Sequence, residues 1–153
     1  MNYNYYQQKN EVLHSNKNSS VLKIMLCDDE PNILKSEKIV INSICKKLNK
    51  EVFITLSNDG LDCVHKLVED YKEGIFYSIL FIDQYMKNLD GLQAISLIKS
   101  LQYKKRLNDF PIYCVSGINE DESLLKAGAK GVLSKPTNKA IMQQALKDCG
   151  LLN

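Results

Sequence analysis

Five short, mainly apolar runs recur along the sequence, and segments with helical patterns separate them. The runs cover residues 21–28, 52–56, 77–82, 111–115 and 131–133. Strands whose apolar residues are continuous rather than alternating are covered on both faces, as in a parallel sheet. Because crossovers between parallel strands are right-handed, five such β/α units predict a three-layer α/β sandwich.

The segments after these runs carry apolar residues at helical spacing. They cover residues 34–48, 61–71, 92–101, 121–127 and 141–149. Pro31 suits the first turn of the first helix, since the N–H that proline lacks would have no partner there. Glu37 is the one polar residue that interrupts the apolar stripe of that helix.

Bulk composition narrows the class of protein and its partners. At 153 residues the chain is expected to form one domain with a sizeable core. A formal net charge of +2, without a stripe of basic residues, predicts neither nucleic acid nor an anionic membrane surface as a partner. No apolar run reaches membrane-spanning length, and no secretory signal is visible.

The cysteines and the first twenty residues indicate the setting and the extent of the folded part. Five scattered cysteines, without a CxxC or a Cys/His cluster, indicate neither a zinc site nor a disulfide framework, so a reducing, cytoplasmic setting is expected. Residues 1–20 are polar and show no helical or strand period, which predicts a disordered leader. The folded domain is predicted over residues 21–150.

Polar residues stand at the ends of four of the five apolar runs. Asp28 and Asp29 belong to the first, Asp83 to the third, Ser116 to the fourth and Lys135 to the fifth. In open parallel sheets, ligands bind at the carboxyl ends of the strands, near the topological switch point. Four strand ends therefore bring three carboxylates, one hydroxyl and one ammonium together, which predicts a metal-assisted phosphoryl acceptor.

The three acids predict a site for a hard divalent cation. Carboxylates placed together repel one another, and one of them would tend to stay protonated without a counter-charge. Mg²⁺ prefers oxygen ligands and keeps several waters, so it suits a shallow site with carboxylates and a phosphoryl oxygen. Capping of the first helix would also explain one or two acids in Asp28-Asp29-Glu30. It explains neither Asp83 nor a lysine at another strand end.

Lys135 and Ser116 supply the other groups that a phosphoryl site needs. Pro136 pushes the residue before it toward an extended conformation, which suits a lysine at a strand end. The ammonium of Lys135 can then pair with Asp83 and with a phosphoryl oxygen. Ser116 precedes Gly117, where a backbone can approach closely. Taken singly, an ordinary solvated lysine and a plain Ser-Gly turn would explain these residues equally well.

In this order the motifs resemble the receiver domain of two-component phosphorelays, over about residues 21–150. The family has an acidic pair after strand one, Asp-x-x-Met-Pro-x-Met-Asp-Gly after strand three, a Ser/Thr after strand four and Lys-Pro after strand five. The matching stretches here are Asp28-Asp29, Asp83-Gln84-Tyr85-Met86-Lys87-Asn88-Leu89-Asp90-Gly91, Ser116 and Lys135-Pro136. The resemblance implies a flavodoxin-like, doubly wound, five-stranded parallel sheet of order 2-1-3-4-5, with helices on both faces.

The resemblance also implies a role for each residue. Asp83 would be the nucleophile that forms an aspartyl phosphate. Lys135 would neutralise charge on the phosphoryl group, and Ser116 would bond a phosphoryl oxygen after transfer. The Mg²⁺ ligands would be Asp29 directly, Asp28 through water, Asp83, and the backbone carbonyl of Tyr85.

Three residues depart from the family pattern or modify it. Lys87 replaces the usual loop proline, which predicts a more flexible loop. Tyr85 is large and adjoins the acceptor, which predicts a shielded acyl phosphate and slow self-hydrolysis. Val132 stands where many receivers carry Tyr or Phe, which puts the aromatic part of the family's switch in question. His65 is expected to be an ordinary helix residue rather than a phosphodonor.

The predicted function is acceptance of a phosphoryl group from a phosphohistidine on a histidine kinase or a histidine phosphotransfer protein. No Gly-rich nucleotide loop is present, so ATP is not expected to be the direct donor. The chain would catalyse only its own phosphorylation and dephosphorylation, as a monomer or weak dimer. Two rivals are a degenerate receiver that only binds proteins and an aspartyl-phosphate phosphohydrolase. Such a phosphohydrolase would need an Asp-x-Asp spacing after its first strand, and Cys27-Asp28-Asp29-Glu30 lacks this spacing.

Overall fold

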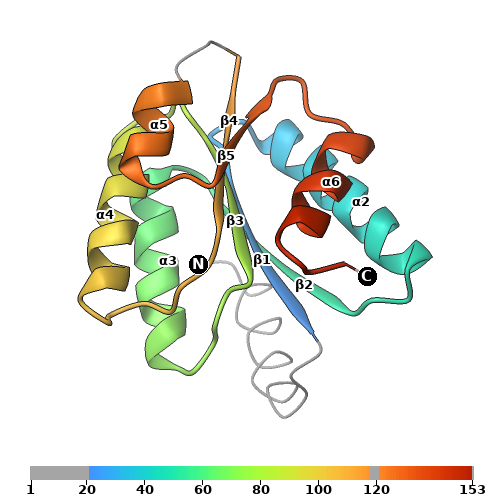
Figure 1. Cartoon of the computed structure of the whole chain (residues 1–153), viewed down its shortest axis with the longest axis horizontal. Coiled ribbons are helices and arrows are strands. Elements are labelled where there is room, and N and C mark those ends of the chain that lie inside the picture. Colours follow the sequence, from blue (N-terminus) through green and yellow to red (C-terminus); the bar gives the residue numbers. More distant parts are fainter. Residues whose placement is uncertain (1–20, 118–120, 153) are drawn as a thin grey trace.

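The computed structural model describes residues 21–117 and 121–152, in which five strands alternate with five helices (Figure 1). The strands are β1 (Leu22–Cys27), β2 (Val52–Ser57), β3 (Ile79–Asp83), β4 (Ile112–Ser116) and β5 (Gly131–Ser134). The helices are α2 (Pro31–Lys47), α3 (Gly60–Lys72), α4 (Gly91–Tyr103), α5 (Asp121–Ala127) and α6 (Lys139–Asp148). Residues 1–20, where a disordered leader is predicted, lie outside the described part of the chain.

The strands form one parallel sheet in the order β2-β1-β3-β4-β5. Helices α2 and α6 cover one face of the sheet, and α3, α4 and α5 cover the other (Figure 1). The predicted flavodoxin-like, doubly wound α/β fold is therefore confirmed. Since β1 pairs with both β2 and β3, the strand order reverses at β1. The topological switch point therefore lies at the carboxyl ends of β1 and β3.

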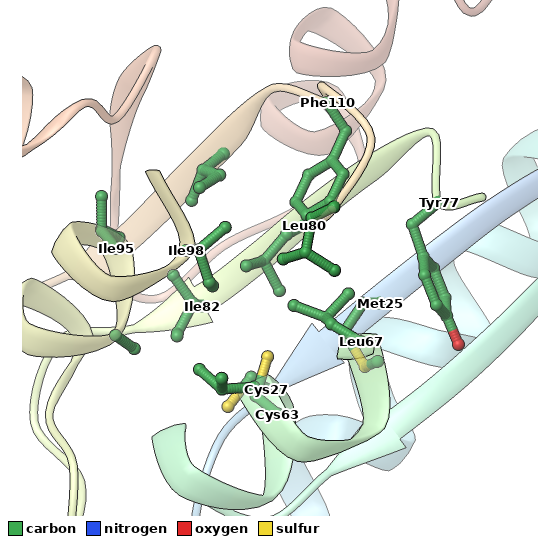
Figure 2. Close-up of a cluster of buried hydrophobic side chains, with 14 of the residues drawn as sticks. Met25, Cys27, Cys63, Leu67, Tyr77, Leu80, Ile82, Ile95, Ile98 and Phe110 are labelled. Carbon is green, nitrogen blue, oxygen red and sulfur yellow. The ribbon is translucent and has the colours of Figure 1, made fainter. Parts of the chain in front are cut away.

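Each face of the sheet has its own apolar core. Met25 and Leu80 point into the core beneath α3, α4 and α5 (Figure 2), whereas Ile24 and Phe81 point into the core beneath α2 and α6. Neighbouring residues of a strand point to opposite faces. Both alternating sets must therefore be apolar, which explains the continuous apolar runs. In β3 every residue is buried, Asp83 included.

The run over residues 77–82 predicts a strand that begins two residues earlier than the one observed, which covers Ile79–Asp83. Tyr77 is buried like a strand residue but lies outside the strand. Its hydroxyl donates a hydrogen bond to Asp70 at 2.7 Å and lies 2.6 Å from the hydroxyl of Thr55. Apolar character predicts that a residue is buried, and it cannot tell whether its backbone pairs with a neighbouring strand.

All five cysteines are free, and four are buried. Cys27 and Cys63 lie side by side in the core beneath α3, α4 and α5 (Figure 2). They behave as small apolar residues there, as buried free cysteines usually do. Among the described residues, no helix combines the length and hydropathy that a membrane span requires.

Side-chain caps fix the beginnings of three helices. Asp59 accepts a hydrogen bond from the backbone of Asp62 at 2.9 Å at the start of α3. Asp90 and Gln93 form a capping box at the start of α4, with bonds of 2.8 and 3.1 Å. Asn138 caps α6 in the same way. These caps satisfy backbone N–H groups that have no partner within the helix, and each stabilises its helix by about 1 kcal/mol.

Gly91 allows α4 to begin directly against the end of β3. A Cβ atom at this position would lie 2.5 Å from the carbonyl oxygen of Asp83 and 2.9 Å from the Cα of Gln84. We expect Gly91→Ala to lower the free energy of unfolding by about 2 kcal/mol, because relieving this overlap shifts packed backbone. Urea denaturation measures the change. Gly117→Ala is the control, since a Cβ there meets nothing within 4 Å, and equal losses in both variants would contradict the prediction.

Candidate functional site

Three carboxylates meet at the carboxyl edge of β1 and β3. Asp28 follows the last residue of β1, and Asp83 is the last residue of β3. One oxygen from each of Asp28, Asp29 and Asp83 lies within 4.8 Å of the other two. Asp28 and Asp83 are buried, at 2% and 5% exposure, whereas Asp29 is exposed. The cluster is therefore buried on the side of Asp28 and Asp83, where it adjoins the sheet, and is open to solvent on the side of Asp29.

Lys135 reaches into this cluster from the segment after β5. Its ammonium nitrogen lies 2.6 Å from Oδ1 of Asp83 and 3.5 Å from Oδ2 of Asp28. The backbone N–H of Lys135 donates to the carbonyl of Ser116 at 3.1 Å, which continues the pairing of β4 with β5. The Lys135–Pro136 peptide bond is cis. The sequence prediction that these strand ends converge is thus matched by the geometry.

The charges at this edge do not balance. Burial raises the pKa of Asp83, the hydrogen bond with Lys135 opposes this effect, and the negative charge of Asp28 adds to it; the pKa ends above its usual value. Burial lowers the pKa of Lys135, but its hydrogen bond and ion pair with Asp83 outweigh burial, so its pKa is raised. One ammonium faces three carboxylates. The uncompensated negative charge and the all-oxygen donor set fit a hard divalent cation such as Mg²⁺.

Side-chain capping of α2 does not account for the acidic stretch after β1. Oδ1 of Asp28 accepts a hydrogen bond from the backbone of Glu30 at 2.8 Å. Glu30 occupies the N-cap position of α2 without a capping bond from its side chain, and the first turn of α2 contains no acid. Oδ2 of Asp28 remains directed at Lys135. The local bond to Glu30 and the contact with Lys135 therefore use different oxygens of the Asp28 side chain.

Ser116 and Tyr85 also lie on this edge. Ser116 is the last residue of β4 and is buried at 5% exposure. Tyr85 follows Asp83 by two residues, and half of its side chain is exposed. The roles predicted for the Ser116 hydroxyl and for the Tyr85 carbonyl stay predictions.

The loop after β3 is tied to the start of α3. Nδ2 of Asn88 donates to Asp59 at 2.7 Å, and Asn88 has a positive φ of 65°. The N–H of Gly60 donates to the carbonyl of Leu89 at 3.2 Å. The greater flexibility predicted from Lys87 therefore has to act against these contacts, and it stays a prediction. Val132 is partly buried against the core beneath α3, α4 and α5.

Sequence reasoning missed the place of Glu37 in this site. Glu37 lies on the inner face of α2 and is only 6% exposed. Burial and, after it, the negative charge of Asp28 raise the pKa of Glu37 to about 7. The one available signal was an acid within an apolar helical stripe, which does not identify its partners. His65, in contrast, is an exposed residue of α3, as expected.

The raised pKa of Glu37 predicts a pH-dependent stability. Its folded-state pKa, about 7, lies above the value of 4.5 for an unperturbed glutamate, so its stabilising contribution is full below pH 4.5 and is lost as the pH rises through 7. Between about pH 5 and pH 8.5, we expect the wild type to lose roughly 2 kcal/mol more unfolding free energy than Glu37→Gln. Urea denaturation in metal-free buffer measures both curves. Parallel curves would contradict the prediction.

Comparison with known families agrees with this geometry. The sequence model of the response regulator receiver domain matches residues 24–147. The chain belongs to the response regulator receiver domain family. The match includes all four strand ends that carry the cluster, Ser116 and Lys135. The matched region of this receiver domain therefore contains the whole carboxylate cluster and Lys135.

One curated relative is the osmosensing histidine protein kinase SLN1 of Saccharomyces cerevisiae. The receiver domain is 28% identical to it over 143 residues, which cover 90% of this chain and 11% of SLN1. The chain thus spans about a tenth of the length of that relative. The match concerns one region of a much larger protein.

Two solved structures illustrate the shared fold. The receiver domain of the sensor histidine kinase PA1611 from Pseudomonas aeruginosa PAO1 is 26% identical, with a TM-score of 0.62 over 84% of this chain and 98% of that one. That crystal structure has a magnesium ion coordinated in its active-site cleft. The co-crystal structure of Ypd1, a histidine phosphotransfer protein of Saccharomyces cerevisiae, with the Ssk1 receiver domain matches at 18% identity and a TM-score of 0.64, covering 86% of this chain and 90% of that one.

Proposed function

We propose that this receiver domain accepts a phosphoryl group on Asp83 from a phosphohistidine of a partner protein. The observation that carries the proposal is the ammonium of Lys135, 2.6 Å from Asp83 within a cluster of three carboxylates. Phosphoryl transfer needs mainly positioning and charge neutralisation, because its transition state is loose and its charge is spread over the transferring oxygens. A buried acid with a lysine against it and neighbouring acids for a cation supplies both.

In the proposed reaction a carboxylate oxygen of Asp83 attacks the phosphorus atom. An O–P bond forms, the P–N bond to the donor imidazole breaks, and the bonding electron pair stays on the imidazole nitrogen. Lys135 offsets negative charge on the phosphoryl oxygens, and the hydroxyl of Ser116 bonds one of them afterwards. Asp28, Asp29, Asp83 and the carbonyl of Tyr85 would hold Mg²⁺, which neutralises further charge when bound.

The proposed partner is a histidine kinase or a histidine phosphotransfer protein. The likeness to the receiver domain of Ssk1, which was crystallised with Ypd1, and to the kinase SLN1 supports this choice. We further propose that phosphorylation changes which proteins the domain binds. Apart from its own phosphorylation and dephosphorylation, the domain is proposed to catalyse no reaction.

Incubation with Mg²⁺ and phosphoramidate or acetyl phosphate tests the proposal. We expect one stoichiometric adduct, stable in acid and labile in base, which peptide mass spectrometry assigns to Asp83. Absence of an adduct would favour a degenerate receiver that only binds proteins. Turnover of an external phosphoester would favour the phosphohydrolase. Phosphotransfer from purified phosphohistidine proteins then identifies the donor.

Tyr85 is expected to lengthen the lifetime of the aspartyl phosphate. Its ring is half exposed two residues beyond Asp83, where it can restrict the approach of water. We expect Tyr85→Ala to shorten the lifetime roughly fivefold, which corresponds to about 1 kcal/mol in the hydrolytic barrier. Decay of the adduct after removal of the donor measures it. Tyr103→Ala, at the exposed end of α4, is the control, and equal lifetimes for Tyr85→Ala and the wild type would contradict the role.

A further inference from the structure

The start of α3 lies against the loop that follows the proposed phosphoryl acceptor. This β3–α4 loop covers residues 84–90, between Asp83 and the first residue of α4. Helices α3 and α4 pack side by side on one face of the sheet (Figure 1). The N–H of Gly60 donates to the carbonyl oxygen of Leu89 at 3.2 Å, and a Cβ atom at Gly60 would overlap that oxygen. The loop and the first residue of α3 are therefore in direct contact.

Asp59 binds the β3–α4 loop through one oxygen and α3 through the other. Oδ1 of Asp59 accepts a hydrogen bond from the N–H of Asp62 at 2.9 Å and caps α3. Oδ2 accepts a hydrogen bond from Nδ2 of Asn88 at 2.7 Å. The backbone carbonyl of Asp59 accepts a third bond, at 3.2 Å, from the thiol of Cys27 at the end of β1. The loop is therefore attached to a residue that is itself fixed to α3 and to the sheet.

The residues on either side of this attachment indicate why the loop needs it. Asn88 has a φ of 65°, which asparagine adopts more readily than most residues other than glycine. Lys87 stands where the family pattern has proline, so its φ lacks the restriction that a proline ring would impose. A less restricted segment loses more conformational entropy when it is ordered. The charge-assisted bond from Asn88 to Asp59 offsets part of that loss.

We propose that Asp59 is a positioning residue for the magnesium site: through Asn88 it holds the β3–α4 loop, and with it the backbone carbonyl of Tyr85, in the conformation that binds the cation. This inference rests on the proposed Mg²⁺-dependent acceptance of a phosphoryl group. It gives the start of α3, which contributes no acid to the carboxylate cluster, a role in cation affinity.

The proposal predicts an effect on cation affinity rather than on the maximal rate. A ligand that binds one loop conformation has its apparent affinity reduced in proportion to the fraction of molecules in that conformation. Loss of the bond to Asp59 would lower this fraction in the metal-free protein. Once Mg²⁺ saturates the site, the loop is held by the cation, and phosphorylation proceeds at nearly the same rate.

Calorimetric titration with Mg²⁺ compares Asn88→Gly, Asp59→Ser and the double variant with the wild type. Asn88→Gly removes the donor without changing the charge and tolerates the positive φ. Asp59→Ser retains a good N-cap for α3, but its side chain is too short to bond Asn88 as well. We expect Asn88→Gly to weaken Mg²⁺ binding roughly threefold, since an exposed hydrogen bond shifts a local equilibrium by only a few fold. In the Asp59→Ser background the same change should weaken binding by less than about 1.5-fold, because the bond is already absent.

Asn49→Gly is the matched control. Asn49 also has a positive φ, 52°, and is exposed, but it follows the C-terminus of α2 at the opposite edge of the sheet. This variant should bind Mg²⁺ like the wild type. In phosphorylation by phosphoramidate, Asn88→Gly should raise the half-saturating Mg²⁺ concentration roughly threefold and keep the maximal rate within about twofold. Partial unfolding would instead lower the yield of adduct at every Mg²⁺ concentration.

Amide hydrogen exchange in metal-free buffer measures the attachment of the loop directly. The N–H of Gly60 bonds the loop, whereas the N–H of Lys50 bonds the carbonyl of Cys45 at 2.8 Å, away from the site. We expect Asn88→Gly to speed exchange at Gly60 roughly threefold, because local opening becomes more frequent, and to leave exchange at Lys50 unchanged. Nuclear magnetic resonance resolves both amides.

Wild-type Mg²⁺ affinity in Asn88→Gly would overturn the inference, and so would an equal effect of Asn88→Gly with and without Asp59→Ser. A reduced maximal rate at an unchanged half-saturating concentration would overturn it as well. If the wild type bound no Mg²⁺ and formed no adduct, the proposed function would fail. Exchange at Gly60 would then decide whether Asp59 holds the loop: faster exchange in Asn88→Gly would support this role, and unchanged exchange would overturn it.

Discussion

Asp83→Asn is expected to accept no phosphoryl group from phosphoramidate or from a phosphohistidine protein. The amide oxygen of asparagine is a far weaker nucleophile than a carboxylate, and no other described carboxylate combines burial with the 2.6 Å contact to Lys135. The expected effect is loss of the adduct, a decrease of at least about a thousandfold in initial rate, or about 4 kcal/mol in the barrier. Intact-protein mass spectrometry measures the adduct, and circular dichroism verifies the fold.

Asp109→Asn is the matched control for this variant. Asp109 is exposed and precedes β4, so it lies at the edge of the sheet opposite the carboxylate cluster. The Asp109→Asn variant should be phosphorylated on Asp83 at the wild-type rate. An adduct of normal yield on Asp83→Asn would mean that another group accepts the phosphoryl group, and the assignment of Asp83 would be wrong.

Lys135→Met is expected to separate phosphoryl transfer from cation binding. The variant removes the ammonium that lies against Asp83 and Asp28 but keeps a long side chain of similar reach. Loss of one preorganised charge at a reacting oxygen costs a hundredfold to a thousandfold in rate, so we expect a loss of several hundredfold, or roughly 3 kcal/mol. Binding of Mg²⁺ should persist and become tighter, because a competing positive charge is gone.

Stopped-flow measurement of phosphorylation over a range of Mg²⁺ concentrations gives both quantities for Lys135→Met. The maximal rate should fall, and the half-saturating concentration should fall with it. Lys104→Met is the control, since Lys104 is exposed at the far end of α4. A Lys135→Met variant that keeps the wild-type maximal rate would remove Lys135 from the reaction.

The architecture was predictable because two local sequence patterns determine it: the apolar runs of the strands and the polar residues at the strand ends. Parallel strands with two covered faces read as continuous apolar runs, and the four strand ends that carry Asp28, Asp83, Ser116 and Lys135 follow from the direction of the strands. Proximity of these residues needs no knowledge of side-chain contacts, since all carboxyl ends of a parallel sheet lie on one edge. The observed distances among Asp28, Asp83 and Lys135 agree with that expectation.

What escaped prediction depends on contacts between distant segments. The burial of Glu37 depends on how α2 packs against the sheet, and no motif in the sequence reveals it. Tyr77 was expected within a strand because its ring is apolar, but the hydroxyl of Tyr77 is fixed by Asp70 and Thr55 instead. The link from Asn88 to Asp59 likewise joins two loops whose approach is set by the packing of α3 against α4. Side-chain pairs of this kind become visible only in three dimensions.

The position of β3 has a consequence for how a signal would leave Asp83. This strand is clamped between β1 and β4, and every one of its residues is buried. A close-packed interior resists gradual deformation. We therefore expect β3 to keep its position after phosphorylation. The added charge would instead move the loops that follow the carboxyl ends of the strands.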